Sequence, residues 1–386
     1  MKKDIQTLLN KYKEGKCSEQ ELRLLEAWFF KIADESQGEE PDSEQIRKIF
    51  NRIAHKASPS KPKVFKIGKR YATIAASILV VIGIGFSLLK TGHIPSLPWS
   101  ETANYDIAAA TDKAILTLQN GKKIALDSLS GHTVFSKYGV EILPGKNGEI
   151  IYRQLPIAHH HPSIDVSAYH TIETPRGGKY QVQLADGSKV WLNAGSSLTF
   201  PVRFDATERK VRLSGEAFFV VNKLIHGPDT ERMQNVSFLV ETDGQTVEVL
   251  GTEFNIKNYT DDLHQYTTLV EGSVKVKLSS GKEIILRPGE QAQSGEHLEA
   301  VHADLEREIA WKNGDFVFKR ETLEEICKQI SRWYNIDITY PEDIKSVRFS
   351  GMIRRSQPLS VIINMIESAG KVKATLKERR LTITKT

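Results

Sequence analysis

Few residues of this chain have types and spacings that could do chemistry. His159, His160 and His161 stand in a row before Pro162, and imidazole is a common ligand of Zn²⁺. Adjacent side chains of an extended segment point to alternate sides, and no cluster of Cys, Asp or Glu lies near them in sequence. We therefore interpret the run as a solvated linker and predict no metal site.

Sequence signatures of enzymes are missing. The chain has no H-E-x-x-H, G-x-S-x-G, G-x-G-x-x-G or G-x-x-x-x-G-K-[ST] pattern. The sequence Arg176-Gly177-Gly178 is too short to cradle a phosphate, and a turn is the simpler interpretation. We expect neither enzyme activity nor a bound cofactor.

One apolar segment predicts that the chain crosses a membrane once. Residues 71–89 contain no charged residue over 19 positions and are apolar on all faces. A helix of this length spans about 28 Å, close to the roughly 30 Å hydrocarbon core of a bilayer. A buried core helix is usually shorter and amphipathic. The flanking residues 59–70 and 90–111 are predicted linkers.

The charges beside this segment predict its orientation. Residues 61–70 hold five basic residues and no acid, whereas Lys90 is followed by no further Lys or Arg until Lys113. Basic flanks stay in the cytoplasm, so the N-terminus is expected inside. The same five residues account for the net charge of +5, because residues 1–60 hold 11 basic and 11 acidic residues and residues 71–386 hold 37 of each. This balance argues against direct binding to nucleic acid.

The two cysteines are not expected to pair. Cys17 and Cys327 are the only cysteines of the chain, and the predicted topology places them on opposite sides of the membrane. Cys327 falls within an apolar helical pattern, so we expect a buried thiol.

Residues 1–58 have the spacing of three short amphipathic helices. The middle helix begins at a capping box formed by Ser18 and Glu21. So small a unit has a thin core and gains stability from a partner. The residues expected to bind that partner share one helical face: Leu22, Leu25, Trp28 and Phe29. The alternative is that they pack only on the other two helices.

Residues 112–300 are predicted to be β-rich, because short stretches alternate apolar and polar residues between turn signals. A weak internal repeat relates Leu116–Ser128 to Val182–Ala194 and, more faintly, to Leu278–Leu286. The first two copies centre on Asn-Gly and Asp-Gly, which favour two-residue hairpin turns because they accept positive φ angles. Repeated hairpins predict an all-β domain of stacked hairpins that resembles a β-solenoid.

Residues 304–386 follow a different order, β-α-β-β-α-β-β. The first helix is predicted to begin at the capping box of Thr322 and Glu325, and the second to begin at Pro358 and end at Gly370. The predicted strands are 316–318, 336–340, 347–350, 372–376 and 381–384. Together they predict a small split α+β domain.

Five motifs of the β-rich part occur in a fixed order: Thr174–Tyr180, Leu184–Leu198, Leu213–Phe219, Val249–Asn255 and Glu271–Val274. In composition and order they resemble the FecR family of anti-sigma regulators. The last domain is similar to the C-terminal module of the Bacteroidetes branch, which resembles the short N-terminal (STN) domain of secretins and TonB-dependent receptors. The motif residues expected to support the fold are Gly177, Gly178, Asp186, Gly187, Trp191, Leu192, Asn193, Gly215, Glu216, Gly251, Phe254 and Asn255.

The resemblance implies a regulator of cell-surface signalling in the bacterial inner membrane. Its cytoplasmic helices would hold an extracytoplasmic-function sigma factor. Its periplasmic part, which includes the C-terminus, would receive a signal from the signalling domain of a TonB-dependent outer-membrane transporter. The C-terminal domain would offer a sheet edge for β-augmentation.

The resemblance also singles out the bond between Gly251 and Thr252. Some members of the family cleave themselves at a Gly-Thr bond by an N→O acyl shift, and this pair stands in the matching motif. The Thr hydroxyl would attack the preceding carbonyl, and Gly would give access and tolerate strain. The alternative, which we favour, is an ordinary turn or strand.

The expected fold is therefore multidomain, with an all-α N-terminal domain, one transmembrane helix, an all-β solenoid-like domain and an α+β C-terminal domain. The favoured function is that of an inner-membrane anti-sigma factor. The alternative is a membrane-anchored periplasmic module that binds a ligand or glycan, with Trp191 as its aromatic contact.

Overall fold

The computed structural model describes residues 106–127, 135–137, 140–145, 148–155, 168–205, 207–226, 234–295 and 297–386. The predicted helices of residues 1–58, with Leu22, Leu25, Trp28 and Phe29, lie outside these ranges, as do the predicted span 71–89 and the His159–His161 run. Within them, no helix is long and apolar enough to cross a membrane. The described part is mostly β-sheet with few helices.

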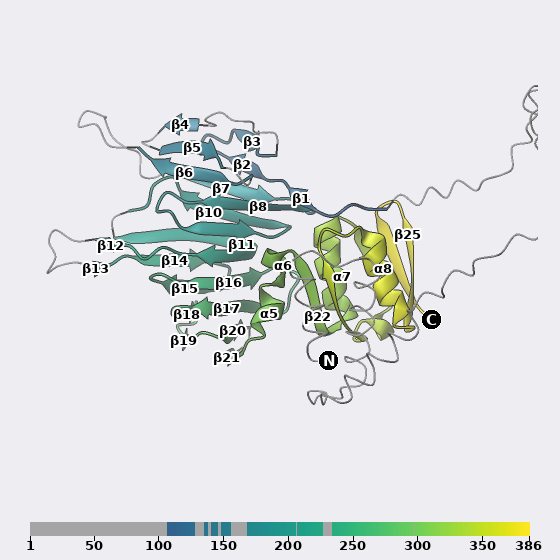
Figure 1. Cartoon of the computed structure of the whole chain (residues 1–386). Helices are drawn as coiled ribbons and strands as arrows, with labels where there is room; N and C mark the ends of the chain where they lie inside the picture. Colours follow the sequence, from purple (N-terminus) through teal and green to yellow (C-terminus); the bar gives the residue numbers. More distant parts are fainter. Residues whose placement is uncertain are drawn as a thin grey trace, which may run out of the picture. The chain divides into compact units, whose positions relative to one another are not determined.

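Two large sheets form the β region, residues 111–302 (Figure 1). The first contains β2 (Ile115–Thr117), β3 (Lys123–Ala125), β7 (Tyr169–Thr174), β10 (Ser196–Pro201), β14 (Ser237–Glu241), β15 (Gln245–Val249), β18 (Val274–Leu278) and β19 (Glu283–Leu286). The second contains β4 (Phe135–Lys137), β5 (Val140–Pro144), β6 (Ile150–Gln154), β8 (Gly178–Gln183), β9 (Lys189–Leu192), β16 (Glu253–Asn258), β17 (Gln265–Glu271), β20 (Glu290–Ser294) and β21 (Leu298–His302). The long β11 (Glu208–Val220) belongs to both, β1 (Thr111–Asp112) pairs with β8, and β12 (Ile225–His226) pairs with β13 (Gln234–Asn235).

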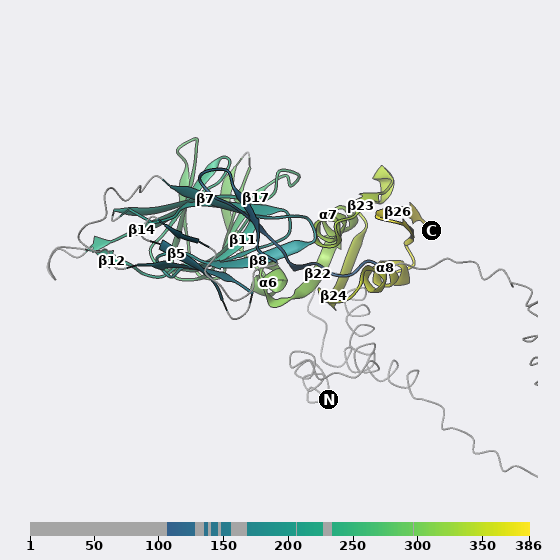
Figure 2. The ribbon, with the colours of Figure 1, turned by 90° about the horizontal axis from the view of Figure 1, so that it is seen from above.

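The two sheets face each other across one apolar core, and Figure 2 shows the layers from above. The chain alternates between the sheets as it adds strands, so strand order within each sheet follows chain order, except that β3 lies at the edge of the first sheet and β2 lies between β3 and β7. The predicted stacking of hairpins is thus present, without a closed barrel among the described strands. The pairing is mostly antiparallel, whereas regular β-helices pair in parallel. Parallel pairs in the described β region are β1–β8, β6–β8 and β11–β14.

The three repeated hairpins close with a turn that differs from the predicted one. The Leu118 N–H donates to the Lys122 carbonyl at 2.9 Å, so three residues rather than two form the loop. Equivalent bonds close the other hairpins, from Leu184 to Ser188 and from Leu278 to Lys282. Only the glycine of each loop has a positive φ: 78° at Gly121, 82° at Gly187 and 88° at Gly281. Such a three-residue loop ends in a bulge with glycine in the left-handed region, so Asn120 and Asp186 need no positive φ.

The chain passes between the two sheets at sharp bends, and we call the five of them that lie in the family-like motifs the crossing bends. The crossing bends are Pro175–Gly177 between β7 and β8, Asn193–Gly195 between β9 and β10, Gly215 within β11, Leu250–Thr252 between β15 and β16, and Gly272–Ser273 between β17 and β18. Four of them carry a glycine with a φ between 71° and 96°. Each bend lies in one of the five family-like motifs, which explains why those motifs are rich in glycine.

The C-terminal domain, residues 304–386, has the predicted order of elements with two additional short helices at its start. Its elements are α5 (Leu305–Glu308), α6 (Ala310–Asn313), β22 (Asp315–Thr322), α7 (Leu323–Tyr334), β23 (Asp337–Thr339), the 3₁₀ turn η1 (Glu342–Ile344), β24 (Arg348–Arg354), α8 (Leu359–Ser368), β25 (Val372–Lys377) and β26 (Arg380–Lys385). Strands β22 and β24 form one small sheet, and β23, β26 and β25 form the other.

Local signals account for both long helices of this domain. Thr322 and Glu325 form the predicted capping box at the start of α7. Pro358 is the N-cap of α8 rather than its first helical residue. Cys327 is buried in the domain core, as predicted, and burial raises the pKa of its thiol to about 12.

Candidate functional site

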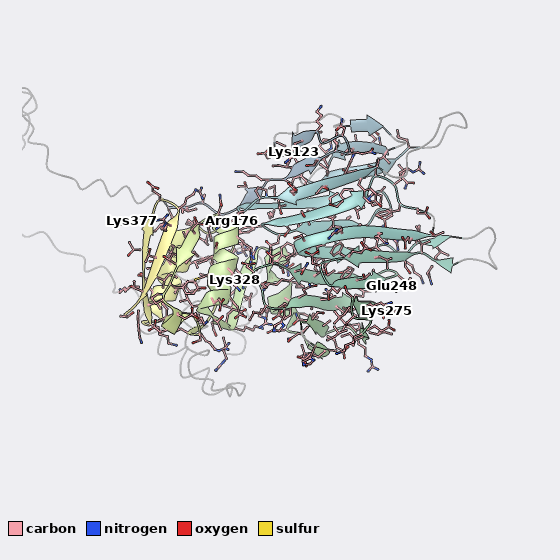
Figure 3. All side chains as sticks on the ribbon, turned by 180° about the vertical axis from the view of Figure 1, so that it is seen from behind. Lys123, Arg176, Glu248, Lys275, Lys328 and Lys377 are labelled. Carbon is pink, nitrogen blue, oxygen red and sulfur yellow. The ribbon has the colours of Figure 1, made fainter. Side chains whose placement is uncertain are left out.

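Two crossing bends, Pro175–Gly177 and Asn193–Gly195, contact the C-terminal domain, and their contacts form the best-defined polar site of the described structure. At the first bend, the Gly177 N–H donates to the Arg332 carbonyl at 2.8 Å. Arg176 reaches from the same bend to the Ser331 hydroxyl at 2.7 Å and to the Asp337 carboxylate at 3.2 Å. Figure 3 labels Arg176 of this bend and Lys328 of the facing helix α7.

Glu216 lies at the centre of this site. It follows the Gly215 bend and is only 7% exposed. Its two carboxylate oxygens accept hydrogen bonds from the side-chain amides of Asn193 at 2.8 Å and of Asn255 at 3.1 Å. A buried carboxylate requires such donors, because its transfer from water to an apolar interior is otherwise very costly.

The C-terminal domain binds the other ends of the same two asparagines. Arg355 donates to the Asn193 side-chain oxygen at 2.9 Å, and the Trp311 indole N–H donates to the Asn255 side-chain oxygen at 3.1 Å. Since Arg and the indole can only donate, both asparagines must turn their NH₂ groups toward Glu216. We call these five residues the junction network.

Arg355 is held by more than its hydrogen bond to Asn193. Its guanidinium lies over the rings of Phe316 and Trp333, 4.4 and 4.6 Å from their centroids. The Trp333 indole donates to the Arg355 carbonyl at 2.9 Å. Burial lowers the pKa of Arg355 to about 10, which leaves the side chain charged at neutral pH.

Two protein-family models match the described part of the chain. The family model described as FecR protein matches residues 170–275, which contain all five motifs, and the model described as FecR, C-terminal, matches residues 315–383. The chain thus contains a FecR domain and a FecR C-terminal domain.

Solved structures resemble this chain as well. Two crystal structures of a protein from Parabacteroides distasonis ATCC 8503, described as a candidate anti-sigma factor, are 27% and 26% identical to it, with TM-scores of 0.50 and 0.51. Each alignment covers 56% of this chain and 99% of the solved chain. No match was found among curated proteins.

The resemblance to the FecR family identified the residues that the β region contributes to the junction network. The sequence did not indicate those that the C-terminal domain contributes. Asn193, Glu216 and Asn255 belong to the motifs, whereas Trp311 and Arg355 were not predicted. Arg355 is 162 residues from Asn193 and has no periodic pattern or motif around it. Only the packing of the two domains brings these side chains together.

Trp191 lies against the C-terminal domain instead of forming an open platform. Its ring is 6.0 Å from that of Phe218, edge to face, and the Lys312 ammonium of α6 lies 4.9 Å from its centroid. Trp191 is half-buried, and with Tyr180 and Trp311 it lines a small cleft of about 150 Å³. Because the Lys312 ammonium lies over the Trp191 ring, on which a glycan would stack, this cleft does not favour the alternative of a glycan-binding module.

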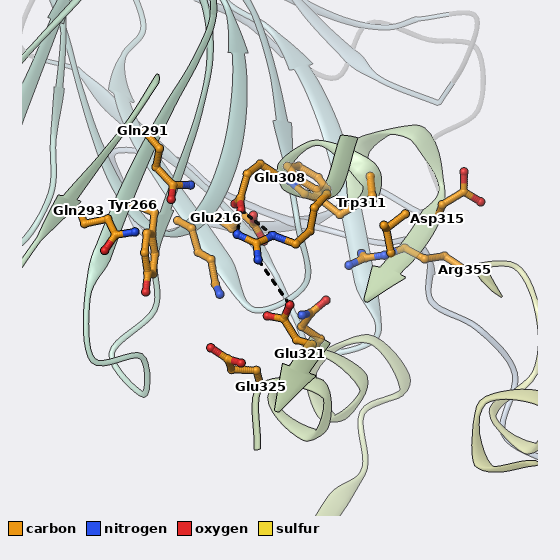
Figure 4. A pocket seen from close by; sticks show the side chains of 15 residues that line it. Glu216, Tyr266, Gln291, Gln293, Glu308, Trp311, Asp315, Glu321, Glu325 and Arg355 are labelled. Carbon is orange, nitrogen blue, oxygen red and sulfur yellow. Dashed lines mark hydrogen bonds and ion pairs between the residues drawn. The ribbon is translucent and has the colours of Figure 1, made fainter. Parts of the chain in front are cut away.

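A polar cleft of about 240 Å³ adjoins the junction network (Figure 4). Charged and amide side chains form most of its lining, among them Glu216, Lys257, Arg307, Glu321 and Arg355. Burial raises the pKa of the Glu321 carboxyl to about 7, although Arg307 lies 3.7 Å away and opposes this shift. The cleft thus contains a carboxyl group that changes charge near neutral pH.

This carboxyl predicts a pH-dependent stability. The folded protein holds the Glu321 proton more tightly than the unfolded chain, so the free energy of unfolding should fall as pH rises from 4.5 to about 7. We expect Glu321→Gln to reduce the loss of stability between pH 5 and pH 8 by about 2 kcal/mol. Chemical denaturation of the full chain in detergent at both pH values measures this. The exposed Glu306 of α5 supplies the control, Glu306→Gln, and an equal pH dependence in both variants would contradict the assignment.

At the opposite end of the β region, Asp186 forms a fully buried ion pair. Its carboxylate accepts from Arg209 at 2.7 Å, and the two side chains are 3% and 0% exposed. Arg209 also donates to the carbonyls of Asn222 at 2.7 Å, Val236 at 2.8 Å and Leu250 at 3.2 Å. Asp186 was expected from its motif and Arg209 was missed. This arginine ties the Asp186-Gly187 turn to the crossing bend that contains Gly251.

Close packing explains the glycine of the Gly251-Thr252 pair. A Cβ atom on Gly251 would lie 2.9 Å from the Lys223 Cβ, and one on Gly272 would lie 2.9 Å from the Gly251 carbonyl oxygen. Thr252 is buried, and its hydroxyl donates to the Ser273 carbonyl at 3.1 Å. Two stacked crossing bends thus account for the motif, and self-cleavage stays a prediction.

The remaining motif residues support the sheets. Phe254 stacks on Phe219 at 5.0 Å between ring centroids, and Leu192 is buried in the same core. A Cβ on Gly178 would lie 2.7 Å from the Lys113 carbonyl oxygen, so glycine is required where β1 passes beside β8.

Proposed function

We propose that this chain is a signal-transducing anti-sigma factor of the inner membrane. The observation that carries the proposal is the junction network, in which motif residues of the FecR domain bind the FecR C-terminal domain through buried hydrogen bonds. The two matching FecR domain models and the similarity to solved candidate anti-sigma factors support the same function.

On the cytoplasmic side, the predicted helices of residues 1–58 would hold an extracytoplasmic-function sigma factor. The apolar face with Leu22, Leu25, Trp28 and Phe29 supplies the contacts, because an amphipathic helix binds a groove through residues one turn apart. The apolar segment 71–89 joins this unit to the periplasmic part.

On the periplasmic side, the β region and the C-terminal domain receive the signal from the signalling domain of a TonB-dependent transporter. An edge strand can accept an added strand from a partner. In the sheet β23–β26–β25 of the described domain, β25 pairs with β26 alone and exposes Lys373, Thr375 and Lys377. Strand β25 is therefore the edge to which the signalling domain of the transporter is proposed to add a strand.

Binding of the sigma factor tests the proposal directly. The full chain in detergent should bind the co-encoded extracytoplasmic-function sigma factor, and Trp28→Ala should weaken this binding at least about tenfold, since buried tryptophans are frequent hot spots. Trp99, in the predicted linker on the far side of the membrane, supplies the matched control Trp99→Ala, which should bind as tightly as the unmodified chain.

Two outcomes would contradict the proposal. One is no association with the sigma factor at micromolar concentration. The other is equal affinity of the Trp28 and Trp99 variants, which would remove the helical face from the interface.

A further inference from the structure

The described structure begins with the segment Asp106–Lys113, which contacts both domains. Ile107 is buried in the core of the C-terminal domain, whereas Ala114, seven positions later, is buried in the core of the β region. Ala109 and Ala110 pack against the same C-terminal core. We call residues 106–113 the strap, because a short run of chain crosses from one core to the other.

The strap supplies the missing cap of helix α8. The N-cap Pro358 makes no side-chain capping bond. Instead, the Asp106 carboxylate accepts from the Ser360 N–H at 3.0 Å and from the Ser360 hydroxyl, and the Ile107 carbonyl accepts from the Leu359 N–H at 2.9 Å. A carboxylate at this position satisfies a free helix amide and interacts favourably with the helix dipole.

The other end of the strap is held less firmly. Strand β1 has only two residues, Thr111 and Asp112, and both are exposed. The Thr111 amide donates to the carbonyl of Gly177, just before β8, at 3.2 Å, and the Lys113 amide donates to the Lys179 carbonyl of β8 at 3.1 Å. No side chain of β1 is buried, so separating this pair exposes little apolar surface.

We infer that the strap moves with the C-terminal domain when the junction between the two domains opens. When that domain is displaced, the hydrogen bonds that pair β1 with β8 break, and the chain that precedes Asp106 is pulled along. This inference rests on the proposed function, in which the preceding chain leads to the membrane span. Under that function, a signal received by the C-terminal domain reaches the span through the strap.

Hydrogen exchange on the full chain in detergent tests the inference with four amides. Leu359 and Ser360 report on the α8 end of the strap, and Thr111 and Lys113 report on the β1 end. The junction is opened with Glu216→Gln, or with Arg176→Ala if that variant does not fold, and the Gly177 amide shows whether it has opened. We expect Thr111 and Lys113 to exchange about tenfold faster or more, with Leu359 and Ser360 unchanged.

A matched pair of strap variants tests the α8 end. Asp106→Ala removes the cap and should speed exchange of Leu359 and Ser360 roughly five- to tenfold. Asp112→Ala removes a carboxylate six residues further on, whose partner Lys179 is 3.7 Å away at the exposed surface, and should leave both amides unchanged.

The inference is overturned if Gly177 exchanges faster and Thr111 and Lys113 remain protected. It is also overturned if Leu359 and Ser360 lose protection first, because the strap would then stay with the β region. These measurements use no sigma factor. Failure of the sigma-factor binding assay and failure of the inference about the strap can therefore be told apart.

Discussion

Arg209→Met is expected to destabilise the β region by about 3–5 kcal/mol, the largest effect of any single substitution proposed for this chain. The substitution removes the only cation that pairs with the buried Asp186 carboxylate in the described structure. It also leaves the carbonyls of Asn222 and Val236 without this donor. An unpaired buried charge costs far more than the lost hydrogen bonds alone. Chemical denaturation of the full chain in detergent, followed by circular dichroism, measures the change.

The same strand supplies the control for this prediction. Arg212 is also on β11 and pairs with Asp243, but the two side chains are 70% and 74% exposed. Arg212→Met should change stability by less than about 1 kcal/mol, because exposed ion pairs contribute little. Asp186→Leu combined with Arg209→Met should recover part of the loss, since no charge is then left unpaired. Equal effects of the Arg209 and Arg212 substitutions would contradict the stabilising role of the buried ion pair between Arg209 and Asp186.

Glu216→Gln should cost about 1.5–3 kcal/mol although the two side chains have nearly the same shape. Asn193 and Asn255 both turn NH₂ groups toward Glu216, because Arg355 and Trp311 occupy their oxygens. A glutamine must point its own NH₂ at one of these donors, so one hydrogen bond becomes a repulsion. Chemical denaturation followed by tryptophan fluorescence measures the cost, since Trp311 and Trp333 lie at the junction.

Glu248→Gln is the matched control. Glu248 lies on β15 and forms an ion pair of 3.2 Å with the half-exposed Lys275 of the neighbouring strand (Figure 3). Its substitution should stay within about 0.5 kcal/mol of the unmodified chain. If Glu216→Gln is equally mild, the amide orientations deduced for the junction network are wrong.

Local signals predicted the C-terminal domain well. The capping box of α7 lies within four residues, and its buried face repeats at helical spacing through Ile326 and Ile330. The strand alternation of Val372–Lys377 is equally local. In these elements the residues that determine the structure are neighbours in sequence, so propensity and periodicity suffice.

The repeated hairpins mark a limit of such signals. Their positions were evident from Asn-Gly and Asp-Gly, but the loops contain three residues instead of two. Either loop places glycine at a positive φ, so the dipeptide alone cannot choose between them. The register of the flanking strands decides, and that register depends on which side chains face the core between the sheets.

The sequence by itself determined the β-rich and α+β parts, the helices with their caps and, through family resemblance, the motifs that became crossing bends. Only the tertiary structure decided what those motifs do. Glu216 obtains its partners when two sheets and a second domain come together, and Ser360 finds the Asp106 cap 254 residues earlier in the chain. Helix periodicity is set by bonds between near neighbours, whereas a polar group that loses its water must pair with whatever folding brings beside it.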